Sequence, residues 1–346
     1  MITFEKKYEE KTMKSRCPKK QLPTVLSRFR SGRMLIRLEF LFLIFACVVL
    51  VLLMSPSLKY VENQEDLDPN EVSPTSGGYS IFHETMVDMN WPDVEKAAEE
   101  GAIILLPTAV IEEHGPHMSC GIDTYGAYLT CKLVRRELEL RGIKTLIAPS
   151  FYWGINGTTH VFPGTFTVRK ETMKALLHDI LYSLKSWGFA DIFNMNFHGD
   201  GQHCVTVLES IIDARKTLGI NTYCVLSEEE VVRYGLTGNE PFIVTHKSPP
   251  SDEAPQEYLD IHAGAGETGI VAAFFPDQVD TELAKTLEPT RLTYSDVVNW
   301  LTDARRVTPL GYLGDPAGFD SEAAKEYFQA NCKLIADSIE SRLKAK

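Results

Sequence analysis

Strand-length apolar runs alternate with helix-length segments along most of this chain, and this alternation constrains the fold more than any other feature. The expected strands lie at about 102–108, 143–148, 190–195 and 220–226, and the expected helices at 125–141, 169–187, 202–218 and 321–343. A glycine directly after a helix favours a left-handed stop, and Gly142, Gly188 and Gly219 occupy such positions. Because alternating strands and helices form a largely parallel sheet with helices on both faces, the sequence predicts an α/β fold, a three-layer α/β/α body with a mostly parallel sheet.

The first residues differ in composition from the rest of the chain. Residues 1–37 carry eleven Lys or Arg against three Glu, a charge of +8, so the remainder carries −20. The apolar run 40–54 follows, and together with 34–38 it approaches the roughly 20 residues of a membrane-spanning helix. Since basic flanks favour the cytoplasmic side, the expected order is a basic cytoplasmic arm (1–33), a single transmembrane helix as anchor (34–54), a flexible linker (55–79) and a catalytic domain (80–346).

The predicted anchor makes this a single-pass membrane protein with its catalytic domain outside the cytosol. The basic region before the apolar run is longer than that of an ordinary signal peptide, which favours a segment that is not cleaved. The alternative is translation from an internal start at Met54, which would give a soluble cytoplasmic protein. In both cases the acidic charge of the body argues against nucleic acid as a partner.

A loop rich in metal-ligand residue types follows the first expected strand. Glu112, His114 and Asp123 come shortly after the apolar run 102–106. Glu112 and His114 are two residues apart, so in an extended segment their side chains leave the backbone on the same side. Oxygen and imidazole ligands together suit zinc, manganese or iron. Taken alone, the segment is equally well explained as a polar surface loop.

Two later segments make a metal site the leading hypothesis. His198 and Asp200 follow the strand expected at 190–195, and His262 and Glu267 lie in a glycine-rich stretch. In open α/β sheets, ligands bind beyond the carboxyl ends of the strands, so loops that are far apart in sequence can converge on one pair of ions. The three segments together predict a two-metal hydrolase site.

The same segments match, in order, the motifs of a known family. Residues 112–123 are similar to its opening Glu-Gln-His-Gly-Pro-His motif and the aspartate that follows, 153–165 to a loop that ends in Phe-Pro-Gly-Thr, and 196–198 to its Asn-Gly-His. His-Ala-Gly-x-x-Glu-Thr is present at 262–268, and Gly-x-x-Gly-Asp-Pro at 311–316. On these motifs, residues 80–346 resemble the creatininase (creatinine amidohydrolase) family.

The resemblance implies a creatininase-like fold with two divalent metal ions per subunit, zinc being favoured and manganese or iron the alternatives. The implied metal ligands are Glu112, His114, Asp123 and His198, with Asp123 bridging the two ions. Some members complete the site with an acid two residues after the histidine of Asn-Gly-His, here Asp200. Others use the glutamate of His-Ala-Gly-x-x-Glu-Thr, here Glu267. We expect both near the metals.

Further side chains have roles implied by the resemblance. His262 is similar to the family's catalytic histidine, which passes a proton to the leaving nitrogen; its alternative role is to cap the glycine-rich turn. His117 and His160 match family positions and are expected to contact substrate or orient ligands. Trp153 is expected to wall the pocket, and Tyr258 to replace in part the tryptophans that close over creatinine in creatininases proper.

The expected activity is that of a dinuclear metal-dependent amidohydrolase, which cleaves a non-peptide C–N bond of a cyclic amide or a formamide with a metal-activated water. Creatinine is disfavoured because Met118 to Cys120 and Phe197 depart from the family motifs. Two alternatives are a peptide-trimming hydrolase of cofactor maturation and a catalytically inactive, membrane-tethered binding protein. The resemblance also implies a small-molecule amide as partner and a homo-oligomer, often a hexamer.

Overall fold

The computed structural model of the chain describes residues 80–250 and 259–345. The predicted arm, anchor and linker at 1–79 lie outside the described residues, as does Tyr258. Among the residues that are described, no helix combines the length and the apolar character that a membrane crossing requires.

The described residues form an alternation of strands and helices close to the predicted one. The strands are β1 (Ile103–Thr108), β2 (Thr145–Ile147), β3 (Asp191–Asn196), β4 (Asn221–Ser227) and β5 (Ile243–His246). The longer helices are α2 (Trp91–Glu99), α3 (Ile122–Leu140), α4 (Lys170–Ser186), α5 (Gly201–Leu218), α7 (Ala265–Phe274), α9 (Tyr294–Thr302) and α11 (Ser321–Lys344). Short helices are α6 (Glu228–Arg233), α8 (Thr281–Ala284) and α10 (Ala304–Val307), and short 3-10 turns lie at Met86–Asp88, Thr159–Val161, Pro276–Gln278 and Pro316–Gly318.

The five strands form one parallel sheet in the order β2-β1-β3-β4-β5. β1 is the second strand in this order, and its Leu105 is paired with Ile147 of β2 on one side and with Phe193 of β3 on the other. In this doubly wound order the chain reverses its direction of strand addition between β1 and β3. Loops that leave these two strands therefore diverge to opposite faces and open a crevice at the carboxyl edge.

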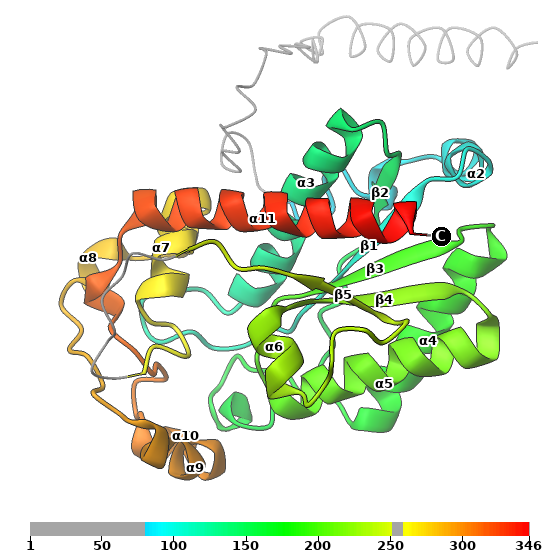
Figure 1. Cartoon of the computed structure of the whole chain (residues 1–346). Helices are drawn as coiled ribbons and strands as arrows, with labels where there is room; N and C mark the ends of the chain where they lie inside the picture. Colours follow the sequence, from blue (N-terminus) through cyan, green and yellow to red (C-terminus); the bar gives the residue numbers. More distant parts are fainter. Residues whose placement is uncertain (1–79, 251–258, 346) are drawn as a thin grey trace, which may run out of the picture. The chain divides into compact units, whose positions relative to one another are not determined.

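Helices cover both faces of the sheet and give three layers, as predicted (Figure 1). Leu105 belongs to the apolar core beneath α3, α7 and α11, whereas its neighbours Ile104 and Leu106 belong to the core beneath α4 and α5. Every residue of β1 is buried. A strand that is buried on both faces reads as a continuous apolar run, which is why the sequence predicts it well.

The structure agrees with the prediction at the ends of three helices but departs from it elsewhere. The three glycines expected to stop helices do have positive φ angles, 75° at Gly142, 101° at Gly188 and 63° at Gly219. However, α3 begins at Ile122 rather than near 125, so Asp123 lies in its first turn. β5 was not predicted, because four residues are too few to show a period. The glycine-rich stretch after His262 is the helix α7 rather than a turn, and this places Glu267 in its first turn.

Candidate metal centre

The predicted metal ligands come from four separate places that meet where β1 and β3 end. Glu112 and His114 lie in the loop after β1, and His198 lies in the loop after β3. Asp123 and Glu267 project from the first turns of α3 and α7. The structure therefore brings these five side chains to the switch point of the sheet, which is the expected place for a ligand site.

Asp123 lies between two histidines. Its Oδ1 is 3.2 Å from Nε2 of His114, and its Oδ2 is 2.8 Å from Nδ1 of His198. Each histidine also faces a second carboxylate: His198 Nδ1 is 3.1 Å from Oε2 of Glu112, and His114 Nε2 is 3.8 Å from Oε2 of Glu267. Two groups share Asp123 and keep their ligand atoms within 4.8 Å of one another, namely Glu112–Asp123–His198 and His114–Asp123–Glu267.

The donor set suits divalent cations. Glu112, His114 and Asp123 are at most 4% exposed, and within residues 80–250 and 259–345 no Lys or Arg forms an ion pair with these acids or with Glu267. Buried carboxylates without such a partner are costly unless a cation compensates them. His114 Nε2 and Asp123 Oδ2 are also buried and, despite the short distances, make no hydrogen bond of acceptable geometry. Lone pairs directed at a common centre, rather than at each other, fit a metal ion.

The charges of the site perturb its pKa values strongly. Burial lowers the pKa of His114, but the nearby charges of Asp123, Glu267 and Glu112 outweigh it and raise the pKa to about 10. Burial also lowers the pKa of His198, but Glu112 and Asp123 outweigh this effect. The pKa of His198 therefore lies well above its usual range. Burial would raise the pKa of Asp123, yet the two histidines hold it far below its usual range. The carboxylates around the two rings therefore favour a positive charge at this place, which is the charge that a bound cation would supply.

Backbone carbonyls fix which ring nitrogen of each histidine faces the carboxylates. His114 Nδ1 donates to the carbonyl oxygen of Glu112 at 3.1 Å, which leaves Nε2 facing Asp123. His198 Nε2 donates to the carbonyl oxygen of Ile155 at 3.1 Å, which leaves Nδ1 facing Glu112 and Asp123. The Thr159 hydroxyl donates to Oε1 of Glu112. Such supporting hydrogen bonds orient metal ligands and select their tautomers.

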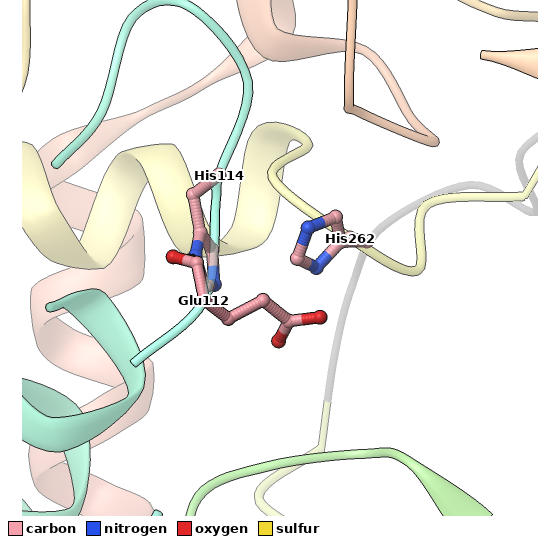
Figure 2. Close-up of side chains that lie close together, drawn as sticks. All are labelled: Glu112, His114 and His262. Carbon is pink, nitrogen blue, oxygen red and sulfur yellow. Dashed lines mark hydrogen bonds between the residues drawn. The ribbon is translucent and has the colours of Figure 1, made fainter. Parts of the chain in front are cut away.

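His262 adjoins this cluster from the loop before α7 (Figure 2). One of its ring nitrogens lies within 4.8 Å of ligand atoms of Glu112 and His114, and its ring centroid is 4.5 Å from that of His114. Nε2 donates to the carbonyl oxygen of Glu113 at 2.8 Å, so Nδ1 is the nitrogen that can exchange a proton. Burial lowers the pKa of His262, but the nearby acids Glu112, Glu113 and Glu267 together outweigh it and raise the pKa.

The Gly-x-x-Gly-Asp-Pro segment supports His262 from behind. The backbone of His262 pairs with that of Leu313 in both directions, at 2.8 and 3.1 Å. Gly311 has a φ of 81°, and a Cβ there would come within 2.1 Å of Oε2 of Glu113. The first glycine of the motif is therefore needed because the backbone passes close to the carboxylate beside the candidate catalytic histidine.

Other predicted site residues lie apart from the cluster. Asp200 belongs to none of the groups of converging ligand atoms; its carboxylate instead accepts from the backbone N–H groups of Gly157, Gln202 and His203 and caps α5. His117 is buried and shares a hydrogen bond with Thr268, and burial together with the charge of His114 lowers its pKa to about 4.

The remaining two lie toward the surface. His160 is exposed, and its Nδ1 donates to the carbonyl oxygen of Gly157 at 2.8 Å. Trp153 is 42% exposed and packs edge-on against Phe166 with ring centroids 5.8 Å apart. Their predicted contacts with substrate stay predictions.

Sequence reasoning missed several residues that support the site. Thr159 and Asn196 lie inside the motifs at 153–165 and 196–198, so their place in these motifs could have indicated that they support the site. Glu113 occupies the glutamine position of the opening motif, and its buried Oε1 lies 3.6 Å from Nε2 of His262. His203 is fully buried behind His198, with ring centroids 4.9 Å apart. Its position as the second residue of the helix expected at 202–218 gave no indication of this contact.

A parallel α/β sheet with a buried carboxylate–imidazole cluster at its switch point is an arrangement that suits a metal-dependent enzyme. The sequence model of the creatininase family, described as creatinine amidohydrolase, matches residues 87–339. The chain therefore belongs to the creatininase family of metal-dependent amidohydrolases, and the resemblance noted in its motifs is confirmed.

Two curated relatives illustrate the range of the family. The creatinine amidohydrolase of Pseudomonas putida is 25% identical over 264 residues, which cover 73% of this chain and 94% of the relative. The mycofactocin precursor peptide peptidase of Mycolicibacterium smegmatis is 23% identical over 238 residues, covering 68% of this chain and 84% of the relative. Relatives of similar identity thus bear names that refer to different substrates.

Solved structures confirm the creatininase-like fold. A crystal structure of creatinine amidohydrolase (creatininase) superposes with a TM-score of 0.58 at 23% identity, covering 75% of this chain and 97% of the other. Two further creatininase structures, with TM-scores of 0.57 and 0.56, are titled as a manganese form and as a mutant of Zn-Zn type.

Proposed function

We propose that this protein is a dinuclear metal-dependent hydrolase that cleaves a C–N bond of a small non-peptide amide, such as a cyclic amide or a formamide. The observation that carries the proposal is the position of Asp123, whose two carboxylate oxygens face two different histidines at 3.2 and 2.8 Å. A carboxylate placed in this way can bridge two cations and hold them the roughly 3.5–4 Å apart that two-metal hydrolases need.

The residues around Asp123 divide into two ligand sets. Glu112 and His198 would complete one set and His114 and Glu267 the other, since the ligand atoms of each group lie within 4.8 Å. Glu267, rather than Asp200, completes the second set in this proposal, because Oε2 of Glu267 faces Nε2 of His114 at 3.8 Å whereas Asp200 belongs to neither group. The manganese and Zn-Zn forms of creatininase support zinc or manganese as the metal. Bound ions would supply a Lewis acid that polarises the carbonyl and activates water.

His262 would supply the proton for the leaving nitrogen. The Nε2–H of its ring is held by the carbonyl oxygen of Glu113, so the ring cannot turn freely and Nδ1 remains available. The negative charge of Glu112 favours the protonated imidazole. A protonated, oriented imidazole within reach of the cluster is a suitable general acid for the departing amine.

Peptide trimming is the second candidate function. It is favoured by the relatives named as mycofactocin precursor peptide peptidases, one of which is 25% identical over 275 residues that cover 77% of this chain. The chemistry of the metal cluster would be the same for both candidates. The substrate that is turned over therefore distinguishes them, and the metal site does not.

Metal analysis and an activity screen of the full-length protein test the proposal. We expect about two divalent ions per chain and hydrolysis of at least one small amide after loading with zinc, manganese or iron. His198→Ala should abolish both metal binding and turnover. His178→Ala is the matched control, because His178 lies on α4 with a side chain that is 43% exposed.

Two results would contradict the proposal. Fewer than one tightly bound ion per chain, with no activity restored by any of the three metals, would exclude a metal-dependent hydrolase. Cleavage of peptides, with no turnover of lactams, formamides or creatinine, would replace the small-amide proposal by peptide trimming.

A further inference from the structure

A hydrogen-bonded path leads from the buried His203 to the candidate metal ligand His198. His203 lies in the first turn of α5 and is fully buried. Its Nδ1 lies 3.3 Å from the backbone N of Ile155, and its Nε2 lies 3.0 Å from Oδ1 of Asn196. A backbone N–H can only donate, so Nδ1 must accept, and the ring is neutral with its proton on Nε2.

The amide of Asn196 agrees with this assignment. Its Nδ2 donates to the carbonyl oxygen of His198 at 2.7 Å, which turns Oδ1 toward His203. Oδ1 then accepts from Nε2 of His203 and also from the hydroxyl of Thr108, at 3.3 Å. Donors and acceptors are therefore matched in only one way along this part of the path.

Ile155 connects the two histidines through its backbone. Its N–H donates to Nδ1 of His203, and its carbonyl oxygen accepts from Nε2 of His198 at 3.1 Å. A carbonyl can only accept, so Nε2 of His198 must carry a proton. Nδ1 then faces Glu112 and Asp123, at 3.1 and 2.8 Å, as the atom available to a cation.

Packing shows that the segment before Ile155 is fitted to His203. A Cβ at Gly154 would come within 2.3 Å of Nδ1 of His203, so only glycine allows the backbone to lie this close. Asp200 holds the same two elements together, because its Oδ1 accepts from the N–H of His203 and its Oδ2 from the N–H of Gly157. The first turn of α5 and residues 154–157 thus form one braced unit behind His198.

We propose that His203 is a positioning residue that fixes the ring orientation and the tautomer of His198 through the backbone of Ile155. The inference rests on the proposed function, in which His198 binds a metal ion. Groups that orient a ligating histidine typically change metal affinity or activity about 10- to 100-fold when they are removed. His203 does this without contact to the ion or to substrate.

Two variants of the full-length protein separate this role from simple packing. His203→Leu fills the space without either polar group, whereas His203→Gln offers a carbonyl oxygen to Ile155 and an amide donor to Asn196. His178→Leu is the control for a histidine-to-leucine change away from the site. Zinc affinity is measured by competition with a chelator, and the ring tautomers by ¹⁵N spectra of histidine-labelled, zinc-loaded protein.

We expect His203→Leu to bind zinc about 10- to 100-fold more weakly and to show a mixture of tautomers at His198. His203→Gln should stay within about threefold of the wild type and keep the Nε2–H tautomer. The control should match the wild type. Zinc affinity unchanged in His203→Leu, or equally reduced in both His203 variants, would overturn the proposal.

The wild-type spectrum decides the matter if His203→Leu does not fold. Nε2–H tautomers at both His198 and His203 support the path, and an Nδ1–H tautomer at either ring overturns it. The failure of this inference is distinct from the failure of the proposed function. If the wild type binds no zinc, the proposed function fails; if the wild type and His203→Leu bind zinc equally well, only the positioning role fails.

Discussion

Adding zinc to the metal-free protein at pH 8 should release about two protons per chain. In the metal-free state, burial lowers the pKa of His114, but Asp123, Glu267 and Glu112 raise it to about 10. The pKa of His198 is raised well above its usual range because Glu112 and Asp123 outweigh burial there as well. The ring nitrogens that face the carboxylates must lose these protons before they can bind a cation.

The expected number of protons depends directly on these shifts. At pH 8, a histidine with a pKa of about 10 is almost fully protonated, whereas one with the ordinary value near 6.5 is only about 3% protonated. An unperturbed pair of histidines would therefore release almost no protons. With two protons exchanged, the apparent affinity for the metal should rise roughly 100-fold per pH unit between pH 7 and pH 9.

The same shifts give the stability of the metal-free protein a defined dependence on pH. The folded-state pKa of His114, about 10, lies above its unfolded value near 6.5. Its contribution to the free energy of unfolding is therefore fully present below about pH 6.5 and is lost as the pH rises through about 10. Metal-loaded protein should not show this loss, because the cation has replaced the proton.

Isothermal titration calorimetry in buffers of different ionisation enthalpy, such as HEPES and Tris, measures the number of protons released. The observed heat should change with the ionisation enthalpy of the buffer, with a slope of about two. His178→Ala, which removes a histidine of α4, should give the same slope. Tight binding of zinc with a heat that does not depend on the buffer would refute the argument, because the histidines would then be unprotonated before binding.

Three further predictions concern single parts of the chain. His262→Ala should keep its metal content, as metal analysis would show, but lose roughly 10²–10⁴-fold in turnover, and loss of the ions instead would make His262 a ligand. Glu267→Ala should lose about one ion per chain, whereas Asp200→Ala should keep both ions and lose about 1 kcal/mol of stability with its helix cap. Chelator competition measures the loss of the ion, and thermal unfolding measures the loss of stability. The reverse pattern would make Asp200 the ligand. Cell fractionation with N-terminal sequencing of the native protein should find the segment 34–54 in a membrane fraction, and a soluble protein that begins at Met54 or later would contradict the anchor.

The layers of this protein were predictable because the sheet is buried on both faces. Ile104 and Leu105 point to opposite cores, so β1 starts as an unbroken apolar run, and in β3 the apolar run 192–195 is interrupted only by Asn194. β5 could not be predicted in the same way, because Ile243–His246 is short and owes its place to pairing with β4. α7 was hidden by its glycines, which disfavour a helix. It forms because it packs against α11, and that contact is tertiary.

The ligand set shows where sequence reasoning stops. Asp200 and Glu267 are both acids at the start of a helix, close to a histidine, and such an acid can either cap the helix or bind a metal. Both accept backbone hydrogen bonds, since Oε2 of Glu267 also accepts from Ala263 at 2.6 Å. The difference is one of direction. The first turn of α7 points Glu267 at His114, 3.8 Å away, whereas the loop at Gly157 draws Asp200 toward itself.

The directions of the Glu267 and Asp200 side chains are set by how separate elements pack, and the local sequence does not encode them. α7 lies on the face of the sheet covered by α3 and α11, so its first turn meets the first turn of α3, which carries Asp123. α5 lies on the opposite face beside α4, and its first turn meets residues 154–157 instead. The switch between β1 and β3 sends α3, which follows β1, and α5, which follows β3, to opposite faces, and α7 packs on the face of α3. The choice between Asp200 and Glu267 therefore follows from the arrangement of the helices on the sheet, and the two separate motifs that supply these acids cannot make it.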